Sequence, residues 1–385
     1  MSVIILKEGR EKALVQRHPW IFSGALKELP LCDKGTILPV HSSSGEFLAQ
    51  AYCNPGNSLV ARVLSFDQRS IDEVIEEKIQ EAVILRERLF KEKKSSAYRL
   101  INGEGDGLPG LVVDRYDGLY VMQISTWGMW RLKSNIVDAL VSIIRPESIY
   151  LKASHTNPEE LPIVAETIYG KKIVEAQVVE NGISFYVNCE TGQKTGLFLD
   201  QRRMREKIQE YAPGRRVLNL CSYTGGFSLY ALQGGALHVT SLDQSRLALE
   251  MCEKNVSLNG FSNHRCIESD LFDFLRNQNH LDADLIILDP PAFAKKREDV
   301  AKAASAYKEI NRLVFQKALP RTLFLSASCS YHIDTRLFGQ LLFQAALEAG
   351  RSLQILSRHI QAEDHPISLF HPEGEYLKSL LLFIK

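Results

Sequence analysis

The stretch that decides the fold runs from Arg216 to Ala231 and reads RVLNLCSYTGGFSLYA. Its first part, Val217 to Leu220, is short and apolar, which is typical of a buried strand. The polar, glycine-containing segment that follows predicts a tight turn, and Phe227 begins a helical pattern. A strand, a glycine turn and a helix form the first half of a nucleotide-binding α/β unit, whose helix start offers unpaired N–H groups to a ligand.

The strands expected after this unit each end in a polar or reactive side chain, and these are Asp243, Asp270, Asp289 and Cys329. Ligands bind at the carboxyl ends of such parallel strands, so we expect one cleft to collect all four. The turn lacks the full G-x-G-x-x-G of pyrophosphate-binding proteins, and Asp243 stands where a ribose-binding carboxylate is expected. This pattern favours a ligand that has a ribose and no phosphates, such as S-adenosylmethionine.

The bulk composition narrows the class of protein. With 385 residues, 45% of them apolar, the chain is long enough for two or three domains. The 46 basic and 46 acidic residues balance, so no global field draws the chain to nucleic acid. Seven scattered cysteines without a C-x-x-C pair argue against disulfides and against a metal site, and they fit a cytoplasmic protein. We expect neither a signal peptide nor a membrane span.

We predict three domains, which cover residues 1–66, 67–188 and 189–385. In the first, strands near 3–6, 36–40, 47–52 and 59–63 predict a small β-barrel. The second mixes helices with two hairpins, turned at Asp117–Gly118 and Asn181–Gly182, and is a middle α+β domain.

In the third domain, strands near 217, 239, 265, 285 and 323 alternate with helices. That alternation predicts an α/β fold with a Rossmann-like parallel sheet, covered by helices on both faces. Two late strands, near 353–357 and 378–384, are expected to finish it as an antiparallel edge.

The segment before this sheet, Glu190 to Arg203, reads ETGQKTGLFLDQRR. We expect Asp200 to be the N-cap of a helix that runs to Tyr211. The segment is either a domain linker or a lid over the cofactor, in which case Lys194 or Arg202 would face an anion.

Several motifs, taken in order, resemble those of the RlmI-like proteins, which are bacterial large-subunit (23S) ribosomal RNA cytosine-C5 methyltransferases with an N-terminal PUA domain. The motifs are RHPWIFSGA at 17–25, ETGQKTGLFLDQR at 190–202, NLCSYTGGF at 219–227, LDPPAF at 288–293, SCS at 328–330 and HPEGEYLK at 371–378. The resemblance implies a PUA barrel, a middle domain and a class I methyltransferase domain. It also implies S-adenosylmethionine as the cofactor and ribosomal RNA as the partner, and it leaves a homodimer open.

Within this family, Cys329 is expected to add to the base and Asp289 to bind it. We expect the cofactor to contact Asn219, Tyr223, Gly225, Gly226, Asp243, Asp270 and Asp289. We expect RNA to contact Arg17, His18, Lys295, Lys296 and Arg297. The other cysteines are expected to be packing residues. Two alternatives stay open: an N6-adenine or N2-guanine RNA methyltransferase, which needs no cysteine, and a non-catalytic RNA-binding protein.

Overall fold

The computed structural model describes residues 2–91, 95–153, 159–294 and 297–385. It forms two compact units, each made from three segments of the chain. The first unit comprises Met1–Val178, Val187–Gly196 and Glu363–Gly374, and the second comprises Val179–Tyr186, Leu197–Ala362 and Glu375–Lys385. Among the described residues, no helix has both the length and the apolar character needed to cross a membrane.

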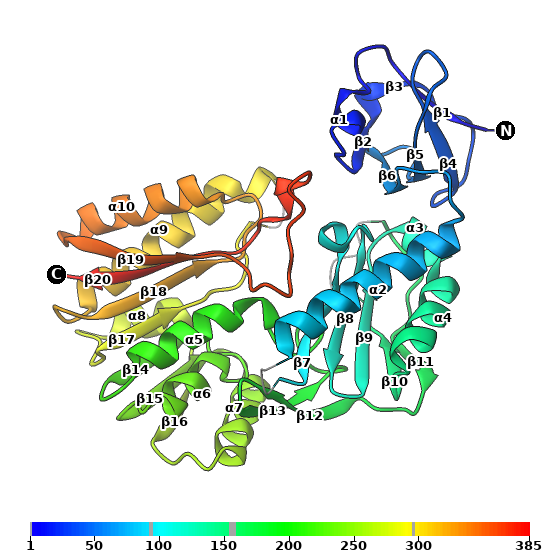
Figure 1. The fold of residues 1–385 in the computed structure, drawn as a ribbon. Helices are drawn as coiled ribbons and strands as arrows, with labels where there is room; N and C mark the ends of the chain where they lie inside the picture. Colours follow the sequence, from blue (N-terminus) through cyan, green and yellow to red (C-terminus); the bar gives the residue numbers. More distant parts are fainter. Residues whose placement is uncertain (1, 92–94, 154–158, 295–296) are drawn as a thin grey trace. The chain divides into compact units, whose positions relative to one another are not determined.

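The first unit begins with a six-stranded sheet in the order β2-β6-β5-β4-β1-β3 (Figure 1). Its strands are β1 (Ile4–Leu6), β2 (Trp20–Phe22), β3 (Leu26–Glu28), β4 (Ile37–His41), β5 (Phe47–Cys53) and β6 (Leu59–Ser65), joined by α1 (Lys12–Val15) and η1 (Ser23–Ala25). The four predicted strands are confirmed as β1, β4, β5 and β6. The sequence analysis missed β2 and β3, which have three residues each and lie beside turn residues.

The rest of the first unit is built on a five-stranded sheet in the order β11-β10-β9-β8-β7. The strands are β7 (Ala97–Asn102), β8 (Leu111–Tyr116), β9 (Leu119–Ile124), β10 (Ser148–Leu151) and β11 (Glu166–Gly170), with α2 (Ile71–Phe90), α3 (Trp127–Arg131), α4 (Lys133–Ile144) and η2 (Gly103–Asp106). Helix α2 begins with a capping box, in which Ser70 and Glu73 satisfy each other's backbone N–H groups. The predicted hairpin at Asp117–Gly118 is confirmed as β8 and β9.

A second hairpin joins β12 (Glu175–Glu180) and β13 (Ile183–Asn188). Its turn residues, Asn181 and Gly182, have φ of 51° and 83°, as a two-residue hairpin turn requires. In the second unit, the tip of this hairpin is held by the helix α7 (Arg246–Leu258), because Tyr186 N donates to Asn255 Oδ1 at 2.8 Å.

The second unit is a seven-stranded sheet in the order β16-β15-β14-β17-β18-β20-β19. The strands are β14 (Arg216–Leu220), β15 (His238–Asp243), β16 (His264–Glu268), β17 (Leu285–Leu288), β18 (Leu323–Ser328), β19 (Leu353–His359) and β20 (Lys378–Ile384). The first five are parallel, and β20 runs antiparallel to both of its neighbours. This confirms the predicted Rossmann-like sheet and its antiparallel edge.

Helices cover this sheet on both faces. Alternate strand residues such as Leu218, Leu220 and Ile286 form one apolar core with α8 (Leu271–Asn277), α9 (Val300–Lys317) and α10 (Thr335–Ala349). The helices α5 (Arg202–Tyr211), α6 (Gly226–Gln233) and α7 pack together, with α6 and α7 against β14, β15 and β16 (Figure 1). Short 3-10 turns precede α5 (η3, Leu199–Gln201), α9 (η4, Arg297–Asp299) and β20 (η5, Pro372–Gly374).

Candidate active site

The glycine turn follows β14 and has an unusual backbone. Cys221, Tyr223 and Gly225 all have positive φ, at 63°, 49° and 86°. A Cβ atom built on Gly225 would lie under 3.0 Å from Cys252 Sγ, so no larger residue fits there without displacing α7 or the turn. Helix α6 begins at the next residue, Gly226, so its first backbone N–H groups are presented at the carboxyl end of the sheet.

Asp243, the last residue of β15, is tied to this turn. Its Oδ2 accepts a hydrogen bond from Tyr223 N at 2.8 Å, and its Oδ1 accepts one from Ser245 N at 2.9 Å. Each carboxylate oxygen can accept a second hydrogen bond. The half-buried carboxylate therefore fixes the turn and keeps acceptor capacity for the two hydroxyls of a ribose.

Three carboxylates surround the first residue of the turn. Burial raises the pKa of the Cys221 thiol, and the negative charges of Asp289, Asp243 and Asp270 raise it further. Asp270 also caps α8, because its Oδ1 accepts from Phe272 N at 2.8 Å and from Asp273 N at 3.1 Å. The acids predicted at three strand ends thus act on one sulfur atom, and Cys221 remains a protonated wall residue.

Asn219 lies beneath the turn and is fully buried. Its Nδ2 donates to Ser228 Oγ at 2.9 Å, and Ser228 is hydrogen-bonded in turn to Ser241 at 2.7 Å. This placement shows what the amide nitrogen binds, and the expected contact between Asn219 and the cofactor stays a prediction. Asn219 supports the turn from below.

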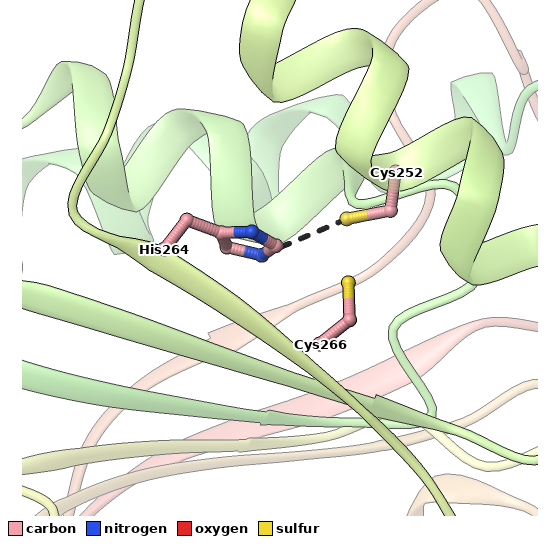
Figure 2. A group of neighbouring side chains, drawn as sticks. All are labelled: Cys252, His264 and Cys266. Atoms are coloured by element: carbon pink, nitrogen blue, oxygen red, sulfur yellow. Dashed lines mark hydrogen bonds between the residues drawn. The ribbon is translucent and has the colours of Figure 1, made fainter.

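The same network continues to the edge of the sheet, where Cys252, His264 and Cys266 point toward one another (Figure 2). Their ligand atoms all lie within 4.8 Å of one another, and Cys252 Sγ is 3.7 Å from His264 Nε2. His264 Nε2 is also 2.8 Å from Ser241 Oγ, and burial lowers the pKa of this imidazole to about 4. The three side chains have the chemistry of soft-metal ligands, but hydrogen bonds account for their arrangement.

The LDPPAF and SCS motifs meet at the ends of β17 and β18. Asp289 follows β17, and its Oδ2 accepts a hydrogen bond from Gln201 Nε2 at 2.7 Å. Ser330 Oγ accepts from Ala294 N at 3.3 Å and lies 3.0 Å from Tyr307 Oη. Burial raises the pKa of Tyr307 to about 12, with smaller contributions from the charges of Cys329 and Asp289. Cys329 and Asp289, which the sequence analysis expects to act on the base, therefore both lie near Tyr307.

Lys378 is a functional candidate to which the sequence analysis assigned no role, although it is the last residue of the HPEGEYLK motif. It opens β20 opposite Ser328, it is 5% exposed, and its Nζ donates to Ser330 O at 2.7 Å and to Ile333 O. Burial lowers its pKa to about 8, and nearby Cys329 acts in the opposite direction. A lysine at the head of the apolar strand KSLLLFI was the signal available in the sequence.

The segment before α5 differs from the prediction. The N-cap of α5 is Gln201 and not Asp200, because a 3-10 turn precedes the helix. Asp200 Oδ2 instead accepts a hydrogen bond from Tyr376 Oη at 2.7 Å. The expectation that Arg202 faces an external anion is also wrong, because its Nε donates to buried Glu180 at 3.0 Å.

The predicted RNA-contacting residues fall into two groups. In the first unit, Arg17 is exposed, with its guanidinium 4.8 Å from the ring centroid of Phe66. His18 is partly buried, and its Nε2 lies 3.5 Å from Glu373 Oε1. In the second group, Lys295 and Lys296 lie outside the described residues, and Arg297 begins η4.

Two motifs far apart in the sequence meet in the first unit. The rings of Trp20 and His371 are 4.4 Å apart, and Trp20 Nε1 donates to Glu104 Oε1 at 3.0 Å. The RHPW and HPEGE segments therefore share one cluster. The neighbouring ring of Phe22 is 49% exposed.

Comparisons with known proteins agree with this architecture. A model of S-adenosylmethionine-dependent methyltransferases matches residues 156–368, and a PUA-like domain model matches residues 4–66. The chain is 38% identical to "Ribosomal RNA large subunit methyltransferase I" of Aliivibrio fischeri (strain MJ11), over 97% of each chain. It is 37% identical to the protein of the same name from Vibrio vulnificus (strain YJ016), over 98% of each chain.

Among solved structures, SMU.776 in complex with SAH superposes with a TM-score of 0.88 over the full length of both chains. At 24% identity this likeness shows the shared fold. The two relatives from Aliivibrio fischeri and Vibrio vulnificus show the family as well as the fold, because each is more than one third identical to this chain over nearly its whole length. The chain therefore belongs to the ribosomal RNA large subunit methyltransferase I family, and it joins a PUA-like domain to an S-adenosylmethionine-dependent methyltransferase domain.

Proposed function

We propose that this chain makes 5-methylcytosine in large-subunit ribosomal RNA, with Cys329 as the nucleophile and Asp289 as the residue that binds the base. The observation that carries the proposal is their placement at the ends of the neighbouring parallel strands β18 and β17, where the charges of both act on Tyr307. Cys329 is partly exposed at its strand end. The other cysteine near this edge, Cys221, has a raised pKa and faces three acids, which makes it a poor nucleophile.

The residues of the glycine turn fit S-adenosylmethionine. Gly225 and Gly226 allow a close backbone approach, and Tyr223 is held by Asp243, which keeps acceptors for the ribose hydroxyls. Asp270 is exposed near the same turn and suits the adenine amino group. Ser222 Oγ is buried and, among the described residues, has no hydrogen-bond partner, so it suits a polar ligand atom. When bound, the cofactor supplies the activated methyl group.

Cytosine C5 is too weak a nucleophile to take that methyl group directly. The Cys329 thiolate adds to C6, forming a C–S bond and making C5 electron-rich, while Asp289 stabilises the base at N3. Once C5 carries the methyl group, a base removes the C5 proton and the C–S bond breaks, which restores the ring and releases the thiolate. Covalent catalysis of this kind divides one difficult step into easier ones.

RNA binding is proposed for two basic regions. Arg17 is exposed in the PUA-like domain, as are Lys7, Arg10 and Lys12, which precede it in the sequence, and such cations suit a phosphate backbone. Lys295, Lys296 and Arg297 follow the Asp289–Pro290–Pro291 motif in the sequence and are proposed to contact the phosphates of the bound RNA. The proposed substrate places the enzyme in the cytoplasm.

The main rival is an amino-group methyltransferase, in which the aromatic residue after Asp-Pro-Pro stacks on a flipped adenine or guanine. In this chain the residue directly after Asp-Pro-Pro is Ala292. The next residue, Phe293, packs partly buried against the core, with its ring 4.8 Å from that of Tyr307. An aromatic ring engaged in this way favours the cytosine reaction. A binding protein without activity is disfavoured because the three acids around Cys221 are all present.

The test incubates the purified protein with labelled S-adenosylmethionine and large-subunit ribosomal RNA that lacks the native modification. Nucleoside mass spectrometry should then detect 5-methylcytidine with the wild type and none with Cys329→Ala, while the variant binds S-adenosylhomocysteine within a few-fold of the wild type. Detection of N6-methyladenosine or N2-methylguanosine, or substantial turnover by Cys329→Ala, would overturn the proposal.

A further inference from the structure

Lys378 is the buried charged group that the proposed reaction has not yet used. Lysine is almost never fully buried without a partner, and here the side chain is 5% exposed at the head of an apolar strand. Within the described parts of the chain, no carboxylate lies at salt-bridge distance from its Nζ. Two main-chain carbonyls, Ser330 O and Ile333 O, accept hydrogen bonds from it instead. Burying a charged ammonium group costs desolvation free energy, so we expect Lys378 to serve a function at this position.

The two carbonyls belong to the loop that carries Cys329. Ser328 ends β18 and pairs with Lys378 across the antiparallel ladder, so the lysine backbone lies level with the residue before the cysteine. Its side chain then reaches past Cys329 to the carbonyls of Ser330 and Ile333. One lysine thus fixes the backbone on the C-terminal side of the sulfur, while the strand pairing fixes it on the N-terminal side.

We propose that Lys378 is a positioning residue for the nucleophile, which holds the loop of Cys329 and places a positive charge beside its sulfur. This rests on the proposed function, because it gives Cys329 the role of nucleophile. The thiol proton leaves to water, and the ammonium keeps its own protons and stabilises the thiolate that remains. A cation within reach of a thiol is the usual means by which proteins favour the thiolate.

Other charged groups face the same place. Asp334, which caps α10, and Glu375, before β20, both lie close enough to favour the charged lysine. Tyr307 on α9 and Asp289 after β17 are also close, because the charges of Cys329 and Asp289 both act on Tyr307. A negative charge at Asp289 would oppose the thiolate. With a pKa of about 8, Lys378 is mainly protonated at pH 7, so it is the cation that offsets this acid.

The experiment measures alkylation of Cys329 by iodoacetamide from pH 6 to pH 10 in the full-length protein without RNA. Peptide mass spectrometry separates Cys329 from the six other cysteines. The variants are Lys378→Met, which removes the charge, and Lys378→Arg, which keeps it. Lys308→Met is the matched control, because Lys308 is paired with Glu348 on the surface between α9 and α10. Binding of S-adenosylhomocysteine, measured by calorimetry, checks that each variant is folded.

In Lys378→Met we expect the midpoint of the Cys329 profile to rise by about one pH unit, which lowers alkylation at pH 7 about tenfold. Lys378→Arg should stay within about threefold of the wild type, and Lys308→Met should match it. A Lys378→Met profile equal to that of the wild type would overturn the proposal. If Lys378→Met does not fold, Lys378→Gln, which keeps a donor without the charge, is judged by the same criterion. Active Cys329→Ala would instead sink the proposed function, so the two failures are distinguishable.

Discussion

The contact between Gly225 and Cys252 gives a prediction whose size follows from the structure. Gly225 has φ of 86°, where an alanine costs about 1–2 kcal/mol. Its Cβ would also overlap Cys252 Sγ, and forced overpacking of this kind costs about 1–3 kcal/mol. Gly225→Ala should therefore lower the free energy of unfolding by about 2–5 kcal/mol.

Gly260, just after the same helix α7, provides a matched control. Its φ is 75°, and a Cβ there would meet nothing within 4 Å, so Gly260→Ala should cost only the backbone term. At about 2–4 °C per kcal/mol for a domain of this size, Gly225→Ala should lower Tm roughly 1.5 to 4 times as much as Gly260→Ala. Scanning calorimetry measures both values, and titration with S-adenosylhomocysteine should show weaker binding only for Gly225→Ala.

A double-mutant cycle isolates the overlap. Removing the sulfur with Cys252→Ala leaves Cys252 Cβ at 3.3 Å from the new methyl group, which is tight but tolerable. In that background Gly225→Ala should cost only about 1–2 kcal/mol, so the coupling energy should be about 1–3 kcal/mol. Equal losses in the two backgrounds would refute the reasoning that Cys252 Sγ occupies the space beside Gly225.

Three further predictions concern the cofactor, the RNA and pH. Asp243→Ala should weaken S-adenosylmethionine binding at least tenfold, since charge-assisted hydrogen bonds contribute about 1.5–3 kcal/mol each, and unchanged calorimetric affinity would remove the ribose assignment. Replacing Lys295, Lys296 and Arg297 with alanine should reduce the log–log salt slope of RNA binding by up to about one per contact, and a wild-type slope would show that they are a solvated loop. Burial lowers the pKa of His264 in the folded chain to about 4, whereas a histidine in an unfolded chain has a pKa of about 6.5. As the pH falls between these values, the unfolded chain binds a proton that the folded chain does not, so the folded state loses stability. Over this pH range the wild type should lose roughly 1–2 kcal/mol of unfolding free energy, after allowance for partial exposure of His264, and His264→Asn should not. Plots of Tm against pH that run parallel for the two proteins would contradict this.

The architecture of the second unit could be predicted because its signals are local. Short apolar runs such as Leu285–Leu288 alternate with helical patterns, and parallel strands with intervening helices pack in few ways. The strand ends, and with them Asp243, Asp289 and Cys329, follow from the same alternation. The hairpin at Asn181–Gly182 was predictable because that turn type demands positive φ at both residues.

Long-range partners were not predictable in the same way. The residues around Asp200 predict that it is a helix N-cap, but its side chain is hydrogen-bonded to Tyr376, which is 176 residues away in the sequence. Arg202 reads as an exposed cation and is instead buried against Glu180. The position of Lys378 next to the Cys329 loop depends on its antiparallel pairing with Ser328, which the local sequence does not predict.

The most direct test of the central claim uses RNA that contains 5-fluorocytidine at the methylated position. After methyl transfer, the fluorine on C5 cannot leave as a cation, so elimination stalls and the C–S bond persists. The wild type should form an adduct with this RNA that resists denaturation, and peptide mass spectrometry should place the nucleotide on Cys329. Cys329→Ala should form no adduct. Absence of an adduct in the wild type, or an adduct on any other cysteine, would contradict the account.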